Sequence, residues 1–326
     1  MKKIWSSIII MSLFIFIGIQ ILTERAAILE SVTFSFSIWK NNIFPSLFPF
    51  FVLSEILMNY GFIELCGELL KPIMVRLFKT NSSCAFIFVM SIISGFPSNA
   101  KYTKELLEQG RIDEQEGTKI LMFTCFSNPL FILGTVSILF LNNKEVGLLI
   151  LLCHYIGNII IGILFRNFYP TKEKSCSISL KKAIFSMHQK RISNSSNFGQ
   201  ILTKALQNSI STLLLILGTV TTFLVITTII DKNIQLNNYN QSILNGFVEM
   251  TQGLKYVSVL NIPLKLKSIL TAMILSFGGL SVHMQVISII STTKIKYFPF
   301  LVARVIHALL ASILVFFLFD FWTLLL

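Results

Sequence analysis

Residues 206–230 read LQNSISTLLLILGTVTTFLVITTII, and no side chain in this run is charged. A helix needs about 20 apolar residues to cross the roughly 30 Å hydrocarbon core of a bilayer. Residues 4–22 and 147–165 are also free of charge, and 44–62 contain only Glu55. A transmembrane β-barrel would show alternating stretches of about ten residues instead, and none is seen. The sequence therefore predicts an all-α membrane protein with several spans.

The composition supports the same class. Of 326 residues, 54% are hydrophobic and 13% charged, whereas soluble domains carry about 25% charged residues. The net charge is +12, but the basic residues lie mostly between apolar runs, where they set orientation in the membrane. The lipid bilayer is therefore the expected surroundings, and nucleic acid is not expected as a partner.

Sequence motifs for chemistry or cofactors are lacking. The five cysteines share no metal-type spacing and imply no disulfide framework. No phosphate-binding loop, zinc-binding His pair or nucleophile elbow occurs. We therefore expect no enzyme activity, no metal and no cofactor. Lys2-Lys3 and the apolar run that follows resemble a signal peptide, but the run exceeds the usual 7–15 residues, which favours an uncleaved first helix.

Hydropathy predicts helices near 4–22, 43–60, 118–140, 146–166, 202–230 and 299–320. Two further apolar stretches, 83–100 and 268–291, are interrupted by Gly95-Phe96-Pro97 and by Phe277-Gly278-Gly279. Gly and Pro open the backbone, and open backbone at membrane depth is tolerated only beside protein or a watery cavity. We interpret these stretches as re-entrant hairpins or broken helices. Two ordinary kinked spans are the alternative.

The chain divides into an N-terminal helix with its connector (1–40), a first repeat (41–166), a basic loop (167–200) and a second repeat (201–326). An offset of about 182 residues aligns the two interruptions. Residues 166–191 hold seven Lys and Arg against one Glu, so this loop and the N-terminus are predicted to be cytoplasmic. With that loop between them, the halves would be inverted repeats within one helical bundle. Broken segments at matching positions of two halves point to a transporter's binding site.

Residues 94–101 form the first polar cluster. A helix that begins after an open turn presents free N–H groups and a positive dipole, which suit an anion, and Lys101 adds a full charge to its first turn. The alternative is a Lys that reaches the headgroups from a solvent-facing loop.

The second cluster is Ser127-Asn128-Pro129. Pro129 leaves nearby carbonyls unpaired, so Ser127 and Asn128 could bind substrate or only stabilise a kink. The third cluster joins Glu249 and Thr251 with polar residues beyond the Gly278 break.

Ionisable groups at membrane depth usually face a cavity. Glu249 could hold a proton or cation there, or pair with Lys255 at the interface. His283 could hold a proton or address a ring nitrogen. His154 and His307 have no evident partners in the sequence and are interpreted as packing residues.

These motifs resemble those of the sporulation integral membrane protein family YlbJ, also called SpoVV. The resemblance covers about residues 35–320 and rests on five stretches: 42–55 (NIFPSLFPFFVLSE), 94–101, 127–136, 249–251 and 277–285. It implies a nucleoside-recognition (Gate) fold similar to nucleoside transporters with paired hairpins. It also implies movement of dipicolinic acid across the outer forespore membrane, from mother cell toward forespore. Phe96 and Asn99 depart from the family pattern.

Dipicolinate is a planar dianion with a ring nitrogen, so helix N-termini and Lys101 would suit its carboxylates, and His283 or Gln285 its ring. A nucleoside-type permease and a non-transporting scaffold that recruits proteins through the 167–200 loop are the alternatives, and a homo-oligomer is left open. The polar clusters and the resemblance together make the following residues candidates for binding a small anionic substrate: Ser94, Gly95, Pro97, Ser98, Asn99, Lys101, Ser127, Asn128, Glu249, Thr251, Gly278, Gly279, Ser281, His283 and Gln285.

Overall fold

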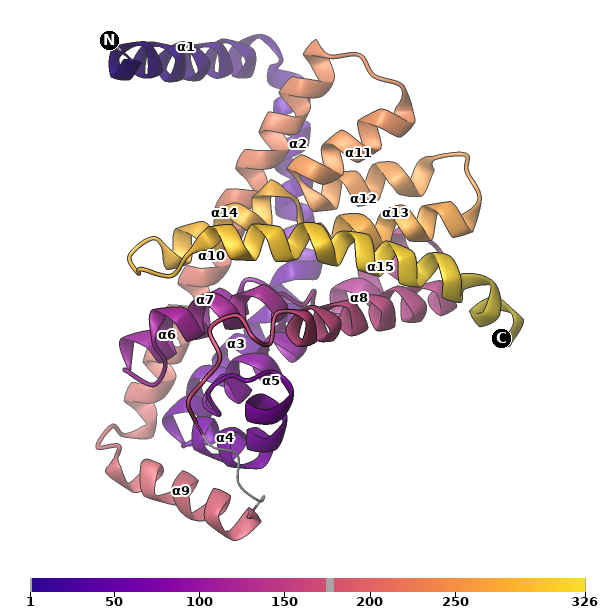
Figure 1. Cartoon of the computed structure of the whole chain (residues 1–326). Coiled ribbons are helices and arrows are strands. Elements are labelled where there is room, and N and C mark those ends of the chain that lie inside the picture. Colours follow the sequence, from indigo (N-terminus) through magenta and orange to yellow (C-terminus); the bar gives the residue numbers. More distant parts are fainter. Residues whose placement is uncertain (1, 174–178, 326) are drawn as a thin grey trace.

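The computed structural model describes residues 2–173 and 179–325, so Lys174 and Cys176 of the basic loop lie outside the described residues. The described chain consists of helices joined by turns (Figure 1). Six of its helical segments are long and apolar enough to cross a membrane. Large apolar side chains remain exposed along them, among them Phe317 at 71%, which suits contact with lipid. The predicted class, an all-α multi-pass membrane protein, is confirmed.

The first half begins with one long helical path that changes from α to π-helix and back. Its helices, in chain order, are α1 (Lys2–Thr23), α2 (Arg25–Ile38), the π-helix η1 (Trp39–Ile43), α3 (Phe44–Asn59), α4 (Phe62–Pro72), the π-helix η2 (Ile73–Leu77), α5 (Cys84–Ser94), α6 (Ser98–Glu108), α7 (Glu114–Phe123), the π-helix η3 (Phe131–Phe140) and α8 (Lys144–Leu164). The stretch 25–59 is therefore one span, longer than the predicted 43–60.

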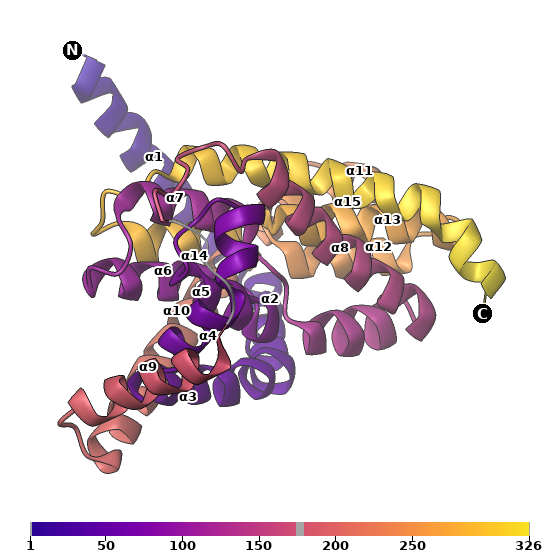
Figure 2. The same cartoon turned by 60° about the horizontal axis from the view of Figure 1, so that its bottom comes forward.

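A short helix of the basic loop, α9 (Leu180–Ser193), precedes the second half. The second half consists of α10 (Phe198–Asn233), α11 (Asn238–Val248), α12 (Met250–Val259), α13 (Leu264–Phe277), α14 (Gly279–Ile290) and α15 (Tyr297–Leu325). Helix α9 packs on α4, and α10 packs on α2 and α3. In Figure 1, α4 and α9 lie at the bottom of the view and α12 and α13 at the upper right, and Figure 2 shows α9 at the lower left, away from α12 and α13.

The two predicted interruptions differ in kind. Helices α5 and α6 pack on each other and form a hairpin that turns at Gly95. In contrast, α13 and α14 form a single span of 27 residues that is broken at Gly278. The second hairpin is α11–α12, which turns at Glu249. These helices pack so closely that a Cβ on Gly253 would lie 2.1 Å from the Gly246 Cα atom.

The halves therefore correspond at an offset different from the predicted 182 residues. Each contains a hairpin, then a broken helix, then a long helix: α5–α6, α7–η3 and α8 in the first, and α11–α12, α13–α14 and α15 in the second. The turns at Gly95 and Glu249 are 154 positions apart, and His154 and His307 are 153 apart. The offset of 182 was wrong because it paired a hairpin turn with a helix break. The inverted orientation of the halves and the domain boundaries stay predictions.

The long helices that end the two halves form the centre of the structure. Helix α15, yellow in Figure 1, lies along α8 and also packs on α13. Buried apolar side chains of α8, α13 and α15 form one core cluster with residues of η3 and α12. Both broken helices are therefore held against the α8–α15 pair.

Candidate functional site

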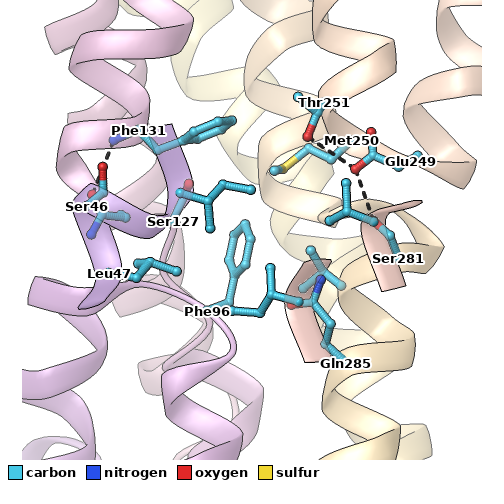
Figure 3. A pocket seen from close by; sticks show the side chains of 15 residues that line it. Ser46, Leu47, Phe96, Ser127, Phe131, Glu249, Met250, Thr251, Ser281 and Gln285 are labelled. Carbon is cyan, nitrogen blue, oxygen red and sulfur yellow. Dashed lines mark hydrogen bonds between the residues drawn. The ribbon is translucent and has the colours of Figure 1, made fainter. Parts of the chain in front are cut away.

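A closed pocket lies where both hairpin turns and both helix breaks meet (Figure 3). It holds about 50 Å³ of free space. Its walls also include residues of α3 and α10. The lining residues are Ile43, Ser46, Leu47, Phe96, Ser127, Asn128, Phe131, Ile216, Val220, Glu249, Met250, Thr251, Ser281, Val282 and Gln285.

The first hairpin turn is bonded to the break between α7 and η3. Phe96 N–H donates to Phe126 O at 2.7 Å, and Asn128 Nδ2 donates to Ser94 O at 3.3 Å. Gly95 has φ +75°, and a Cβ there would lie 2.5 Å from Asn128 N. Only glycine adopts that backbone without strain, so Gly95 allows the turn to reach the broken helix.

The break itself exposes a hydroxyl to the pocket. Asn128 Oδ1 accepts hydrogen bonds from the N–H groups of Leu130 and Phe131 and so caps η3. Ser127 N–H donates to His154 Nε2 at 2.9 Å. The Ser127 hydroxyl is buried and has no hydrogen-bond partner within the described chain. An unpaired buried hydroxyl is costly, so a bound molecule would supply its missing partner.

The second hairpin turn carries the carboxylate of the pocket. Glu249 is 1% exposed and caps α12 by accepting from Gln252 N–H at 2.8 Å. The hydroxyls of Thr251 and Ser281 also donate to it, at 3.2 and 3.4 Å (Figure 3). The alternative of a Glu249–Lys255 pair is not seen, because Lys255 Nζ lies over the Phe34 ring.

Gly279 has the same role as Gly95 at the second contact. A Cβ on Gly279 would lie 2.8 Å from Met250 N, and its φ is +68°. Gly278, which precedes α14, gives that helix no side-chain cap. The N–H groups at the start of α14 are therefore free of a capping side chain beside the pocket.

Six of the predicted site residues line the pocket: Ser127, Asn128, Glu249, Thr251, Ser281 and Gln285. Seven others build the turns and breaks behind it: Ser94, Gly95, Pro97, Ser98, Asn99, Gly278 and Gly279. Ser94 and Ser98 donate their hydroxyls to main-chain carbonyls, whereas the buried amide of Asn99 has no hydrogen-bond partner in the described chain.

Two predicted site residues do not line the pocket. Lys101 Nζ pairs with Glu55 Oε1 at 2.6 Å. The His283 ring bonds to the Tyr297 hydroxyl at 2.8 Å and to Phe277 O at 3.1 Å.

Sequence reasoning missed a polar network behind the pocket. Arg304 is 1% exposed and donates to Met122 O, Cys125 O and Asn158 Oδ1. His154 and His307 were interpreted as packing residues without partners, but their rings contact each other, and His307 Nδ1 lies 2.9 Å from an Arg304 nitrogen. The sequence did indicate Arg304, because an Arg inside an apolar run such as 299–320 is a candidate functional residue.

The side chains around the pocket can bind a small molecule. Among residues 2–173 and 179–325, no three His, Cys, Asp or Glu side chains could hold a metal ion. The lining combines hydroxyls, amides and one carboxylate with the rings of Phe96 and Phe131. This arrangement can hold a small planar molecule by its polar edge.

Helical hairpins and broken helices thus meet at a pocket within a multi-pass membrane protein. Residues 42–144 match the family model described as Gate, nucleoside recognition. The chain is 31% identical to sporulation integral membrane protein YlbJ of Bacillus subtilis (strain 168), over 95% of this chain and 82% of that protein. It belongs to the YlbJ family of sporulation integral membrane proteins. No solved structure matches it.

Proposed function

We propose that this protein is a transporter that moves dipicolinic acid across the outer forespore membrane during endospore formation. The observation that carries the proposal is the convergence of two hairpin turns and two helix breaks on one buried pocket. Such segments form the substrate sites of transporters built from repeats. The similarity to a sporulation integral membrane protein supports a role during endospore formation.

The pocket walls suit a flat aromatic acid. Phe96, Phe131 and Met250 supply apolar surface for a ring, and Ser127, Ser281 and Gln285 supply hydrogen bonds. The starts of α6 and α14 lack capping side chains, so their N–H groups can receive carboxylate oxygens. Three hydrogen bonds hold the Glu249 carboxylate toward α12 and Ser281, which lessens its repulsion of an anion.

The pocket is narrow in this structure. Its free space of about 50 Å³ is a few times the roughly 10–15 Å³ that one water requires, so a pyridine dicarboxylate needs the hairpins to move apart. Transport by alternating access requires such movement. A nucleoside is the second candidate substrate, because the matching family model is described as nucleoside recognition.

The test is uptake by liposomes that contain the purified full chain. Dipicolinate should accumulate inside, and an excess of unlabelled nucleoside should not compete. Ser127→Ala should slow uptake because it removes the unpaired pocket hydroxyl. Ser312→Ala is the matched control, since that hydroxyl bonds to Ala308 O of its own helix. Uptake of nucleoside without dipicolinate would favour the second candidate, and uptake of neither would contradict both.

A further inference from the structure

A second, wider cavity of about 1000 Å³ lies between α3, α6, α9 and α10. Exposed residues at the ends of α6 and α9, such as Gln109 and Ser195, line its mouth. It contains eight charged side chains: Glu55 on α3, Lys101, Lys104, Glu105 and Glu108 on α6, Arg111 after α6, Lys190 on α9 and Lys204 on α10. The five cations outnumber the three carboxylates, so the cavity attracts anions.

This cavity lies in line with the closed pocket. On α10, Asn208 and Thr212 line the wide cavity, and Ile216 and Val220 line the closed pocket. Residues four apart share one face of a helix, so both cavities lie along the same face of α10. Helix α14 repeats this order, with Gln285 in the pocket and Ile289 in the cavity.

The Glu55–Lys101 pair stands between the two cavities. On α3, Leu47 lines the closed pocket, Glu55 lines the wide cavity, and the fully buried Phe51 lies midway. Lys101 Nζ is 5.2 Å from the Phe51 ring centroid and 2.6 Å from Glu55 Oε1. Asn208 donates to the other Glu55 oxygen at 3.3 Å. Glu55 thereby joins α3 to both α6 and α10 at the inner end of the wide cavity.

A second acidic side chain lies beside this contact. Glu105 lies one turn beyond Lys101 and lines the same cavity, and its Oε2 atom is buried without a hydrogen-bond partner in the described chain. Two acidic side chains therefore lie near one ammonium group, and Glu55 is the one that pairs with it. If a carboxylate of the substrate paired with Lys101, Glu55 would be left as an unpaired buried anion, which is very costly. Binding one proton from the cavity water removes that cost.

We propose that Glu55 and Lys101 form a proton-linked gate between the wide cavity and the closed pocket. A carboxylate of the substrate replaces Glu55 on Lys101, and Glu55 takes up a proton from water in the cavity. Each opening then carries one substrate and one proton toward the pocket. The identity of the substrate rests on the proposed function, whereas the response of the gate to pH does not.

Transport driven by a pH gradient tests the coupling. With wild-type protein in liposomes, one pH unit of gradient should raise dipicolinate accumulation by up to about tenfold for one-to-one coupling. Glu55→Gln should let dipicolinate equilibrate without accumulation. Glu68→Gln is the matched control, because Glu68 also pairs with a lysine, Lys182, at 2.8 Å but lines neither cavity. Accumulation by Glu55→Gln equal to wild type would overturn the gate.

A second measurement needs no substrate. In a chain with its five cysteines replaced, Ser46→Cys reports on the closed pocket and Thr212→Cys on the wide cavity. In nanodiscs, the ratio of their labelling rates by a charged thiol reagent should rise severalfold as the pH falls. The ratio corrects for the slower reaction of thiols in acid. With Glu55→Gln it should be high at every pH.

A labelling ratio that does not change with pH when Glu55 is present would overturn the proposal. If the labelling ratio changes with pH but the protein does not transport dipicolinate, the gate is supported and the proposed substrate is wrong. If Glu55→Gln fails to fold, Glu105→Gln replaces it. Removal of this neighbouring acidic group changes the charges around the Glu55–Lys101 pair, so the midpoint of the pH response should move. An unchanged midpoint would also overturn the gate.

Discussion

The imidazole rings of His154 and His307 lie 4.8 Å apart, centroid to centroid, where α8 packs along α15. His154 Nε2 accepts from Ser127 N–H at the first helix break, and its Nδ1 bonds to the Ser276 hydroxyl, 2.9 Å away, just before the second break. His307 Nε2 lies 2.8 Å from His154 O. His154 and His307, which occupy matching positions in the two halves, therefore connect the two helix breaks beside the pocket.

Arg304 should be the most costly of these polar residues to replace. Arg304→Gln leaves buried acceptors on α7 and α8 without donors, and each such loss costs about 1–3 kcal/mol. We expect a large fall in thermal stability in detergent. Lys265→Gln is the control, because its partner Asp320 is 70% exposed and such surface pairs contribute at most about 1 kcal/mol. Equal stability of the two variants would show that the Arg304 bonds are dispensable.

Gly95→Ala should separate the first hairpin turn from the broken helix. The added Cβ would lie 2.5 Å from Asn128 N on a backbone with φ +75°, and overpacking of this kind costs about 1–3 kcal/mol. Transport should fall strongly while the protein stays in the membrane. Gly134→Ala is the control, since no atom of the described residues lies within 4 Å of its new methyl group. Normal transport by Gly95→Ala would rule out a tight contact there.

Lys101→Ala should be far more harmful than Lys104→Ala. Lys101 pairs with the buried Glu55 at 2.6 Å, whereas Lys104 lies 3.8 Å from an exposed Glu108. Removal of one partner of a buried pair costs about 3–5 kcal/mol. The double variant Glu55→Gln/Lys101→Met should recover much of the stability, as measured by heating in detergent and gel filtration. If Lys101→Ala and Lys104→Ala behave alike, the pair does not hold α6.

Helix α10 predicts which loops lie on the same side of the membrane. Its 36 residues extend about 54 Å, so residues 195 and 238 should face opposite sides. Because the 167–200 loop is basic, Ser195→Cys and Lys3→Cys should both react from the cytoplasm, and Asn238→Cys from the other side. An impermeant thiol reagent on intact vesicles measures this. Reaction of Ser195→Cys and Lys3→Cys from opposite faces would refute the orientation.

Glu173, outside the spans, should make stability depend on pH. Partial burial raises the pKa of Glu173, but bonds from Lys71 and Ser82 outweigh this and hold the pKa below the usual 4.5. Its stabilisation is therefore present above pH 4.5 and is lost as the pH falls through the lower folded value. The thermal midpoint of Glu173→Gln should fall less in acid than that of the wild type. Parallel curves would show no role for this carboxylate.

The spans and breaks of this protein follow from its sequence alone. Apolar length decides that 206–230 crosses a bilayer, and Gly95, Pro129 and Gly278 interrupt the helix because of their own backbone chemistry. Both are local properties, which is why 144–164, 198–233 and 297–325 appear close to the predicted limits. Polar residues next to those breaks, such as Ser127 and Ser281, line one pocket, and their role in substrate binding stays a prediction.

Only the tertiary structure decided what each break becomes and which polar groups meet. Whether the chain turns back at Gly95 or continues past Gly278 depends on the helix packed against it, not on the glycine. Lys101 and Glu55 are 46 positions apart, and His154 and His307 are 153 apart. A buried charge or imidazole takes the partner that packing brings within hydrogen-bond reach. The hydropathy of the sequence does not indicate which residue that partner is.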